Sequence, residues 1–254
     1  MALGTRIVAD HVQVVKTAKV QLNPAREKGG WSSMKQLADD LFILEGFPPY
    51  LINVYLLGTV LVDAATRFSA RRILRRLRNR SVTLHALTHA HPDHQGASHA
   101  ICTQLGIPLW CGAADAPAME TPGEIMARMP RNWLSGSVGR LWTGPPHPVT
   151  RRLHEGDQVG SFTVIETPGH TVGHISYWRE ADRVLITGDV LCNINIWNGM
   201  VMLRQPEAIF TVDPAQNRRS ARKFLALEPA LVCFGHGPPL RDTRKFAQFI
   251  EKLP

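Results

Sequence analysis

Cysteine is scarce in this chain, and its spacing matches no common metal or redox motif. The four are Cys102, Cys111, Cys192 and Cys233. The absence of a C-x-x-C pair excludes a zinc ribbon. A chain of 254 residues buries enough surface to fold without disulfide bonds. We therefore expect four buried thiols and a reducing compartment.

Long apolar runs are also missing. The longest, residues 50–65, is interrupted by Asn53, Gly58 and Asp63 and is too short to span a bilayer. Residues 1–21 alternate polar and apolar and lack the apolar core of a signal peptide. No repeat of 20–50 residues is present, which argues against a solenoid or propeller. These absences predict a cytoplasmic protein without a membrane span.

The charge balance is basic, with a formal net charge of +8. The densest basic run, residues 71–80, contains Ile73, Leu74 and Leu77 at helical spacing. This pattern is typical of an amphipathic helix with a solvated arginine face. No aromatic residue lies among these arginines, which disfavours single-strand binding, so we do not expect a nucleic-acid partner.

Hydrophobic periodicity predicts an α/β chain that forms one domain over residues 1–254. Strands are expected at residues 12–14, 42–45, 51–57, 59–62, 82–88, 107–111, 162–166, 174–178, 184–187 and 231–234, and helices at 69–79, 94–105, 214–227 and 241–252. Ser69 and Asp213 are the expected N-caps of two of these helices. Each half supplies a sheet and the helices that cover it, so the order predicts four layers, helix–sheet–sheet–helix.

A dense group of metal-binding residue types follows the strand expected at 82–88. The segment reads His89-Ala90-His91-Pro92-Asp93-His94. Residues 89 and 91 of an extended segment point to the same side, and a turn at Pro92 brings Asp93 and His94 round the same centre. Imidazole and carboxylate are the ligands that Zn²⁺ prefers. The segment therefore predicts a divalent-metal site.

Three later residues occupy comparable positions. His170, Asp189 and His236 each lie just after an expected strand and beside a glycine. Strand ends meet at one edge of a sheet, and glycine permits a close backbone approach there. Seven ligands are too many for one tetrahedral ion, but they suit two ions that share a bridging carboxylate.

In these residues the sequence resembles the metallo-β-lactamase-fold metallohydrolase superfamily, and residues 167–174 resemble its glyoxalase II-like and lactonase-like members. The resemblance implies a four-layer αββα sandwich and two divalent ions, with zinc preferred and iron or manganese as alternatives. It implies that Asp189 bridges the ions and is catalytic together with Asp93. It also implies that His89, His91 and His170 hold one ion and that Asp93, His94 and His236 hold the other.

The chemistry expected of such a site is hydrolysis. Two ions lower the pKa of a shared water from about 15.7 toward about 7, so a bridging hydroxide can attack an ester, lactone or thioester carbonyl. Asp93 is also a candidate proton shuttle. Two alternatives remain open at this point, a nuclease or phosphodiesterase and a mononuclear-iron enzyme similar to persulfide dioxygenases.

Residues 115–148 interrupt the strand–helix rhythm and carry six prolines. They also carry a large apolar load: Met119, Met126, Met129, Trp133, Leu141 and Trp142. We expect a helical insertion that forms a lid over the metal site and selects a small, partly apolar substrate. The facing wall is expected from Ile196, Trp197, Met200 and Met202. The alternative is that these side chains only anchor the insertion to the body.

Overall fold

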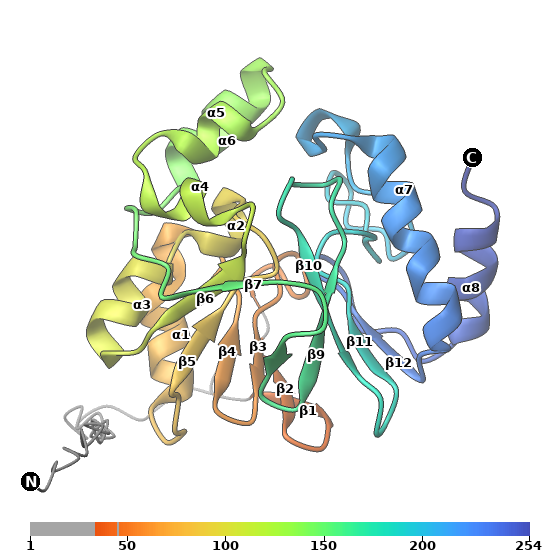
Figure 1. Cartoon of the computed structure of the whole chain (residues 1–254), viewed down its shortest axis with the longest axis horizontal. Coiled ribbons are helices and arrows are strands. Elements are labelled where there is room, and N and C mark those ends of the chain that lie inside the picture. The colour runs from red at the N-terminus through yellow and green to blue at the C-terminus, as the bar shows by residue number, and fades with distance from the viewer. Residues whose placement is uncertain (1–33, 45) are drawn as a thin grey trace, which may run out of the picture.

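The structure is a computed structural model that describes residues 34–44 and 46–254. The strand expected at residues 12–14 and the expected absence of a signal peptide concern residues outside this range. Two β-sheets pack face to face, and helices cover their outer faces (Figure 1). The four-layer αββα sandwich predicted from the sequence is therefore confirmed.

The first sheet has seven strands that lie side by side in chain order. They are β1 (Lys35–Ala38), β2 (Leu41–Ile43), β3 (Tyr55–Leu57), β4 (Val60–Val62), β5 (Leu84–Ala86), β6 (Leu109–Gly112) and β7 (Arg151–Leu153). Strands β1 to β4 are antiparallel, and β4 to β7 are parallel. The ends of β4 and β5 therefore lie at the same edge of the sheet.

The second sheet has five strands in the order β12-β11-β10-β9-β8. They are β8 (Gln158–Val159), β9 (Phe162–Glu166), β10 (Ile175–Arg179), β11 (Val184–Ile186) and β12 (Leu231–Cys233). Its parallel pair is β11 and β12. In β11, Val184 and Ile186 pack between the sheets, whereas Leu185 packs in the cluster beneath the outer helices. This alternation explains why a short strand can be apolar throughout.

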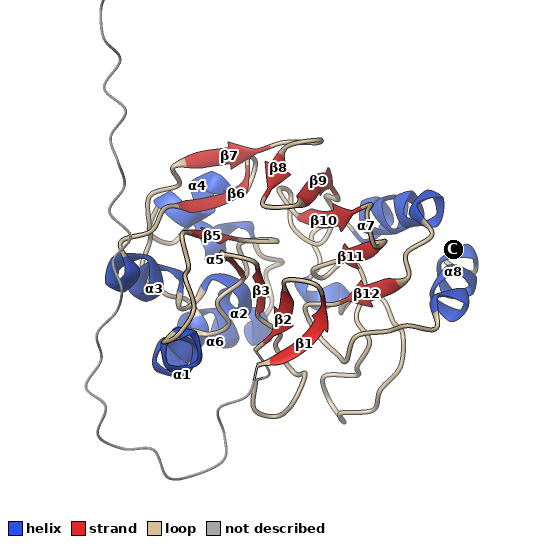
Figure 2. Cartoon of the chain, turned by 90° about the horizontal axis from the view of Figure 1, so that it is seen from below, coloured by secondary structure: helices blue, strands red, loops and turns tan. Residues whose placement is uncertain are grey.

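Helices cover the outer face of each sheet, as Figure 2 shows. The helices are α1 (Ala70–Leu77), α2 (Pro92–Gln95), α3 (Ser98–Leu105), α4 (Ala116–Glu120), α5 (Glu124–Arg128), α6 (Trp133–Trp142), α7 (Pro214–Lys223) and α8 (Thr243–Glu251), with 3₁₀ turns η1 (Arg67–Ser69), η2 (Ala208–Phe210) and η3 (Phe224–Leu227). Helices α1 and α3 pack on the first sheet, and α7 and α8 on the second. None of the helices described is long and apolar enough to cross a membrane.

Several expected elements differ in extent. The helix expected at 94–105 is two helices, α2 and α3, and a Cβ on the intervening Gly96 would meet the backbone nitrogen of Arg67 at 2.4 Å. The strand expected at 51–57 is confined to β3, and its first four residues form a loop. Strands β7 and β8 were not predicted, because two or three residues are too few to show alternation.

The two expected N-caps also have different outcomes. The Asp213 side chain accepts a hydrogen bond from the backbone of Gln216 at 2.8 Å and caps α7. Ser69 occupies the capping position of α1 but makes no side-chain cap bond, because η1 precedes α1 without a break and holds Ser69 in a helical conformation.

Residues 115–148 form α4, α5 and α6. The first part of this segment belongs to the core, since Met119, Ile125 and Met129 are buried in the same cluster as α1 and α3. The alternative that such side chains anchor the insertion to the body therefore applies to α4 and α5. Their prolines and short lengths hide the apolar pattern that buries them. Helices α5 and α6 lie beyond the edge of the first sheet in Figure 1.

Candidate metal centre

The structure brings all seven expected ligands to one edge of the sandwich, where β4, β5, β11 and β12 end. Two follow β5, two lie on α2, and one each lies after β9, β11 and β12. In chain order they are His89, His91, Asp93, His94, His170, Asp189 and His236. Local sequence places each at a strand end, and the shared edge brings them together.

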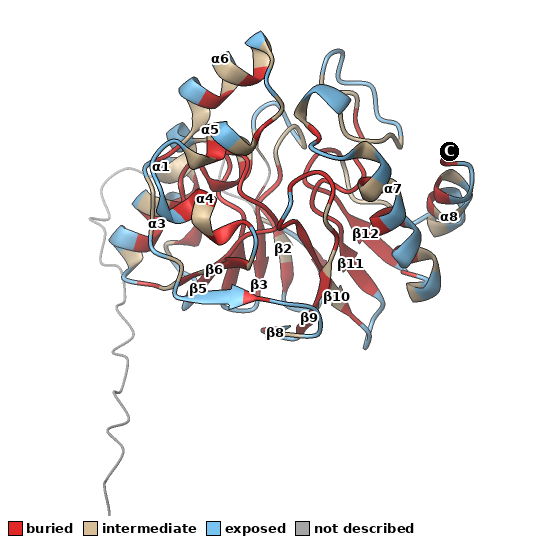
Figure 3. Ribbon diagram, turned by 45° about the horizontal axis from the view of Figure 1, so that its top comes forward, coloured by how far each residue is buried: buried red, intermediate tan, exposed pale blue. Residues whose placement is uncertain are grey.

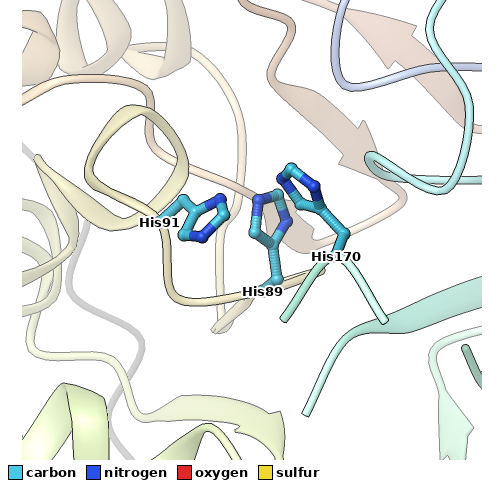
Figure 4. Close-up of side chains that lie close together, drawn as sticks. All are labelled: His89, His91 and His170. Carbon is cyan, nitrogen blue, oxygen red and sulfur yellow. The ribbon is translucent and has the colours of Figure 1, made fainter. Parts of the chain in front are cut away.

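The first group contains His89, His91 and His170. One ring nitrogen of each lies within 4.8 Å of the others, and all three residues are buried. Figure 4 shows the three rings clustered together. The His89 ring centroid is 4.8 Å from that of His91 and 4.9 Å from that of His170. Three imidazoles at this spacing can share one ion.

The second group contains Asp93, His94 and His236, whose ligand atoms also lie within 4.8 Å of one another. The Asp93 Oδ2 atom is 3.3 Å from His236 Nε2 and 4.0 Å from His94 Nε2. Asp93 is the most accessible of the three, with a side-chain exposure of 20%. The group combines two imidazoles with one carboxylate.

Asp189 lies between the two groups. Its Oδ2 atom is within 4 Å of four histidine Nε2 atoms, at distances of 3.9, 3.4, 3.5 and 3.0 Å from His89, His94, His170 and His236 respectively. Two of these histidines belong to each group, so the carboxylate touches both. A bridging ligand of a two-ion site occupies such a position.

Two buried polar atoms of the cluster have no hydrogen-bond partner among the described residues. They are Nε2 of His89 and Oδ1 of Asp189. An unsatisfied buried polar group costs about 1–3 kcal/mol, so such atoms call for a partner that the protein chain does not supply. A divalent cation would provide it, because both atoms present lone pairs. The residues therefore fit the metals that the sequence predicts.

Asp63, for which no role was predicted from the sequence, orients one histidine of each group. Its Oδ2 atom accepts a hydrogen bond from His94 Nδ1 at 2.9 Å. It also accepts the Thr88 hydroxyl at 2.9 Å, and that hydroxyl is 3.0 Å from His89 Nδ1. Both Nε2 atoms are thereby left free to bind a cation. The sequence feature that could have identified Asp63 is its position directly after strand β4, similar to the position of Asp189 after β11.

His170 and His236 are oriented in the same way. The Thr211 hydroxyl donates to the backbone carbonyl of Glu207 and therefore accepts the hydrogen bond from His170 Nδ1 at 3.1 Å. His236 Nδ1 donates to the backbone carbonyl of Leu51. Each bond fixes the tautomer and leaves Nε2 as a ligand atom. The Nε2 atoms of His89, His94, His170 and His236 thus all face one centre.

Comparison with known proteins agrees with this geometry. Residues 47–236 match the family model of the metallo-beta-lactamase superfamily. The chain belongs to this superfamily. It is an enzyme, a metal-dependent hydrolase, since the superfamily fold and an intact ligand cluster occur together.

Among the relatives, a probable metallo-hydrolase of Bacillus subtilis, YflN, is 29% identical over 224 residues and covers 78% of this chain and 84% of that protein. The hydroxyacylglutathione hydrolase of Methylobacterium nodulans is 37% identical, but over only 38% of this chain and 36% of that enzyme. The second likeness therefore concerns a shared part and not the whole enzyme.

Solved structures of the superfamily give the same result. The di-iron-bound form of TTHA1623 has a TM-score of 0.58 and 28% identity, covering 76% of this chain and 91% of that chain. The B3 metallo-beta-lactamase BLEG-1 has a TM-score of 0.60 and 28% identity, covering 84% and 96%. One of these similar structures thus holds two irons, and the other is named as a metallo-beta-lactamase.

The electrostatics of the superfamily site separate its histidines into two kinds. Burial lowers the pKa of His91 to about 4, so its imidazole is neutral and can bind a cation. Burial also lowers the pKa of His94, but Asp189, Asp63 and Asp93 outweigh it and raise that pKa to about 10. Burial lowers the pKa of His236 as well, but Asp189 and Asp93 outweigh it and raise that pKa. Metal uptake at the second group must therefore displace protons.

A second residue missed by the sequence reasoning, Asp115, ties two ligand loops together. Its carboxylate accepts hydrogen bonds from the backbone of Ala90 at 2.9 Å, the Thr171 hydroxyl at 2.7 Å and the backbone of Gly173 at 2.9 Å. These partners flank His89 and His170 in the chain. Asp115 therefore fixes the relative position of the two loops that carry the first group.

The glycine noted beside His236 in the sequence, Gly235, permits its backbone to approach the Asp189 carboxylate closely. A Cβ on Gly235 would lie 2.0 Å from Asp189 Oδ1. His174 accepts a hydrogen bond from the backbone nitrogen of Asp189 at 3.0 Å and contacts the Thr167 hydroxyl at 2.8 Å. His174 therefore helps to fix the backbone of Asp189.

A cavity of about 190 Å³ opens above the ligand cluster. Helix α6 supplies one wall with Leu134, Val138 and Trp142, and Met129 precedes it. The opposite wall comes from the segment after Asp189. Its residues include Cys192, Ile194, Ile196, Trp197 and Phe210. The cavity is thus apolar except at the ligand cluster and at Arg204, Gln205 and Glu207.

The lid residues expected from the sequence divide into three sets. Trp142, Met129, Ile196 and Trp197 line the cavity. Met119 is buried in the core, and Met126 packs against it. The remaining residues lie outside the cavity and are exposed: Trp133, Leu141, Met200 and Met202. Sequence composition identified the segments, but only the structure shows which side chains face the cavity.

Proposed function

We propose that this enzyme is a dinuclear metallohydrolase that cleaves an ester, lactone or thioester bearing a small apolar group. The position of Asp189 carries the proposal, because its Oδ2 atom lies within 4 Å of histidines from both groups. A mononuclear site gives no reason for the second group. We assign His89, His91 and His170 to one ion, Asp93, His94 and His236 to the other, and Asp189 to both.

The residues of the chain hold the reacting groups in place. Two divalent ions at this site lower the pKa of a shared water and polarise a carbonyl oxygen. His91, His170 and His236 line the cavity floor, so a substrate in the cavity faces the ligand cluster directly. Asp93 also faces the cavity, and its partial exposure places it to hold or pass a proton as well as to bind a cation.

The substrate class follows from the walls. Walls of Leu134, Val138 and Ile196 suit an alkyl or aryl group and provide no site for a phosphodiester backbone. A cavity of about 190 Å³ holds a small molecule and excludes a polymer within it, which disfavours the nuclease alternative. The partial likeness to a hydroxyacylglutathione hydrolase supports including thioesters.

The proposal is tested by metal analysis together with a substrate panel. We expect about two divalent ions per purified chain and turnover of lactones, esters or thioesters after loading with zinc, iron or manganese. Zinc and iron are tested side by side, because a relative of known structure holds two irons. A reproducible single iron, with no hydrolysis of any panel member, would refute the dinuclear hydrolase.

Substitution of Trp142 tests whether α6 selects the substrate. Trp142 lines the cavity, so we expect Trp142→Ala to raise KM for long-chain esters by about tenfold, as lost apolar contact of about 1.4 kcal/mol implies, with little change for short ones. Trp133→Ala is the matched control, because Trp133 is on the same helix but 81% exposed. Equal effects of both variants on all substrates would show that α6 acts only as an anchor.

A further inference from the structure

The exposed apolar side chains of this protein lie at a single edge. Among the described residues, all eleven large exposed ones belong to connections at the edge that carries the metal centre. They are Phe47, Phe68, Trp133, Leu141, Val172, Trp197, Met200, Val201, Met202, Ile209 and Val212. We call this set of side chains the mouth face, because the cavity opens among these connections.

The turns at the opposite edge are polar. Exposed acidic residues stand there, including Asp39 and Asp40 between β1 and β2, and Glu180 and Asp182 between β10 and β11. An apolar surface confined to one edge of a water-exposed protein marks an interaction site. The contrast between the two edges assigns that site to the mouth face.

Helix α6 carries apolar side chains both on the side that faces the cavity and on the side that faces solvent. Residues Leu134 and Val138 are one turn apart and line the cavity. Trp133 and Leu141 lie on the outer side, where they line a shallow hollow together with Arg67 and Arg140. Trp133 is 81% exposed and Leu141 53% exposed, and Figure 3 shows exposed positions along α6. A helix with apolar side chains on both sides needs a binding partner that covers its outer side.

The charges beside this hollow are basic. Arg67, Arg131 and Arg140 are exposed. The acids on the neighbouring segments are already paired, Glu124 with Arg128 at 2.9 Å and Glu207 with Arg204 at 2.5 Å. Among the described residues, the hollow therefore combines large apolar side chains with arginines that lie in no ion pair.

We propose that the mouth face docks on an anionic phospholipid surface. Tryptophan and leucine enter the boundary between headgroups and acyl chains, while arginines attract the acidic headgroups. Trp133 and Leu141 with Arg67 and Arg140 supply both parts of this contact on one patch. A second copy of the chain on this face would instead cover the cavity opening. Docking on lipid lets an apolar substrate pass from the bilayer into the apolar cavity.

Vesicle co-sedimentation of the full, metal-loaded chain tests the proposal. We expect binding to vesicles of equimolar phosphatidylcholine and phosphatidylglycerol, weak binding to phosphatidylcholine alone, and loss of binding as salt screens the headgroups. The double variant Trp133→Ser/Leu141→Ser should weaken binding by about tenfold or more. Arg67→Glu/Arg140→Glu should do the same.

The matched control is Arg75→Glu/Arg183→Glu, which changes the net charge equally at two exposed arginines on α1 and at the opposite edge. It should bind vesicles more tightly than Arg67→Glu/Arg140→Glu. The proposal is overturned by absence of binding to anionic vesicles at low salt, or by binding that Trp133→Ser/Leu141→Ser leaves unchanged. The proposal is also overturned if light scattering shows a dimer that Trp133→Ser/Leu141→Ser dissociates, because the mouth face would then join two copies of the chain. Vesicle binding is measured without turnover, so it is independent of the proposed hydrolysis.

Discussion

Asp189→Asn is expected to lose both metals and nearly all turnover. The asparagine keeps the size of the side chain but removes the negative charge that lies 3.0 Å from His236 Nε2 and 3.4 Å from His94 Nε2. A bridging ligand contributes to two ions at once, so its loss should weaken both sites together. We expect turnover to fall by about 100-fold or more, with metal content measured by elemental analysis after dialysis.

The control for this substitution is Asp157→Asn. Asp157 is a carboxylate that pairs with Arg151 in the connection between β7 and β8 and belongs to neither ligand group, so its substitution should leave metal content and turnover unchanged. Circular dichroism of both variants separates metal loss from unfolding. If Asp189→Asn retains two ions per chain, Asp189 does not bridge them.

Asp63→Asn is expected to weaken both sites indirectly. Asp63 accepts hydrogen bonds from the backbone of Thr88 at 2.8 Å and from His94 Nδ1 at 2.9 Å. An amide presents one NH₂ group, which must face one of these donors. We therefore expect a drop of about 10–100-fold in metal affinity, and a destabilisation of about 1–3 kcal/mol from the unsatisfied donor. Isothermal titration and thermal melting measure the two effects.

A conservative substitution of Thr88, the hydrogen-bond partner of Asp63, serves as the comparison. Thr88→Ser keeps the hydroxyl that lies between Asp63 and His89, so it should retain both metals and lose only a small part of the stability. A purely structural role for Asp63 would lower the melting temperature and leave the metal affinity of the folded protein unchanged. That result would contradict the orienting role.

The sequence alone predicted the seven candidate ligands and the layer order. Strand ends share a sheet edge, so a histidine, aspartate or glycine just after an apolar strand already indicates where it lies. His89, His170, Asp189 and His236 all follow this rule. The apolar stripe of Ile73, Leu74 and Leu77 likewise identified α1 and its buried face. Both inferences need only local periodicity and one general property of sheets.

The tertiary structure decided which residues orient the ligands and which line the cavity. The hydrogen-bond partners of His94, His170 and His236 lie 31, 41 and 185 residues away in the chain, and no periodicity relates positions so far apart. Trp133 and Trp142 likewise stand in one short helix, yet one is exposed to solvent and the other lines the cavity. That difference depends on how α6 packs against α2 and α5. It is set by contacts between elements, which hydrophobic patterning along one element does not encode.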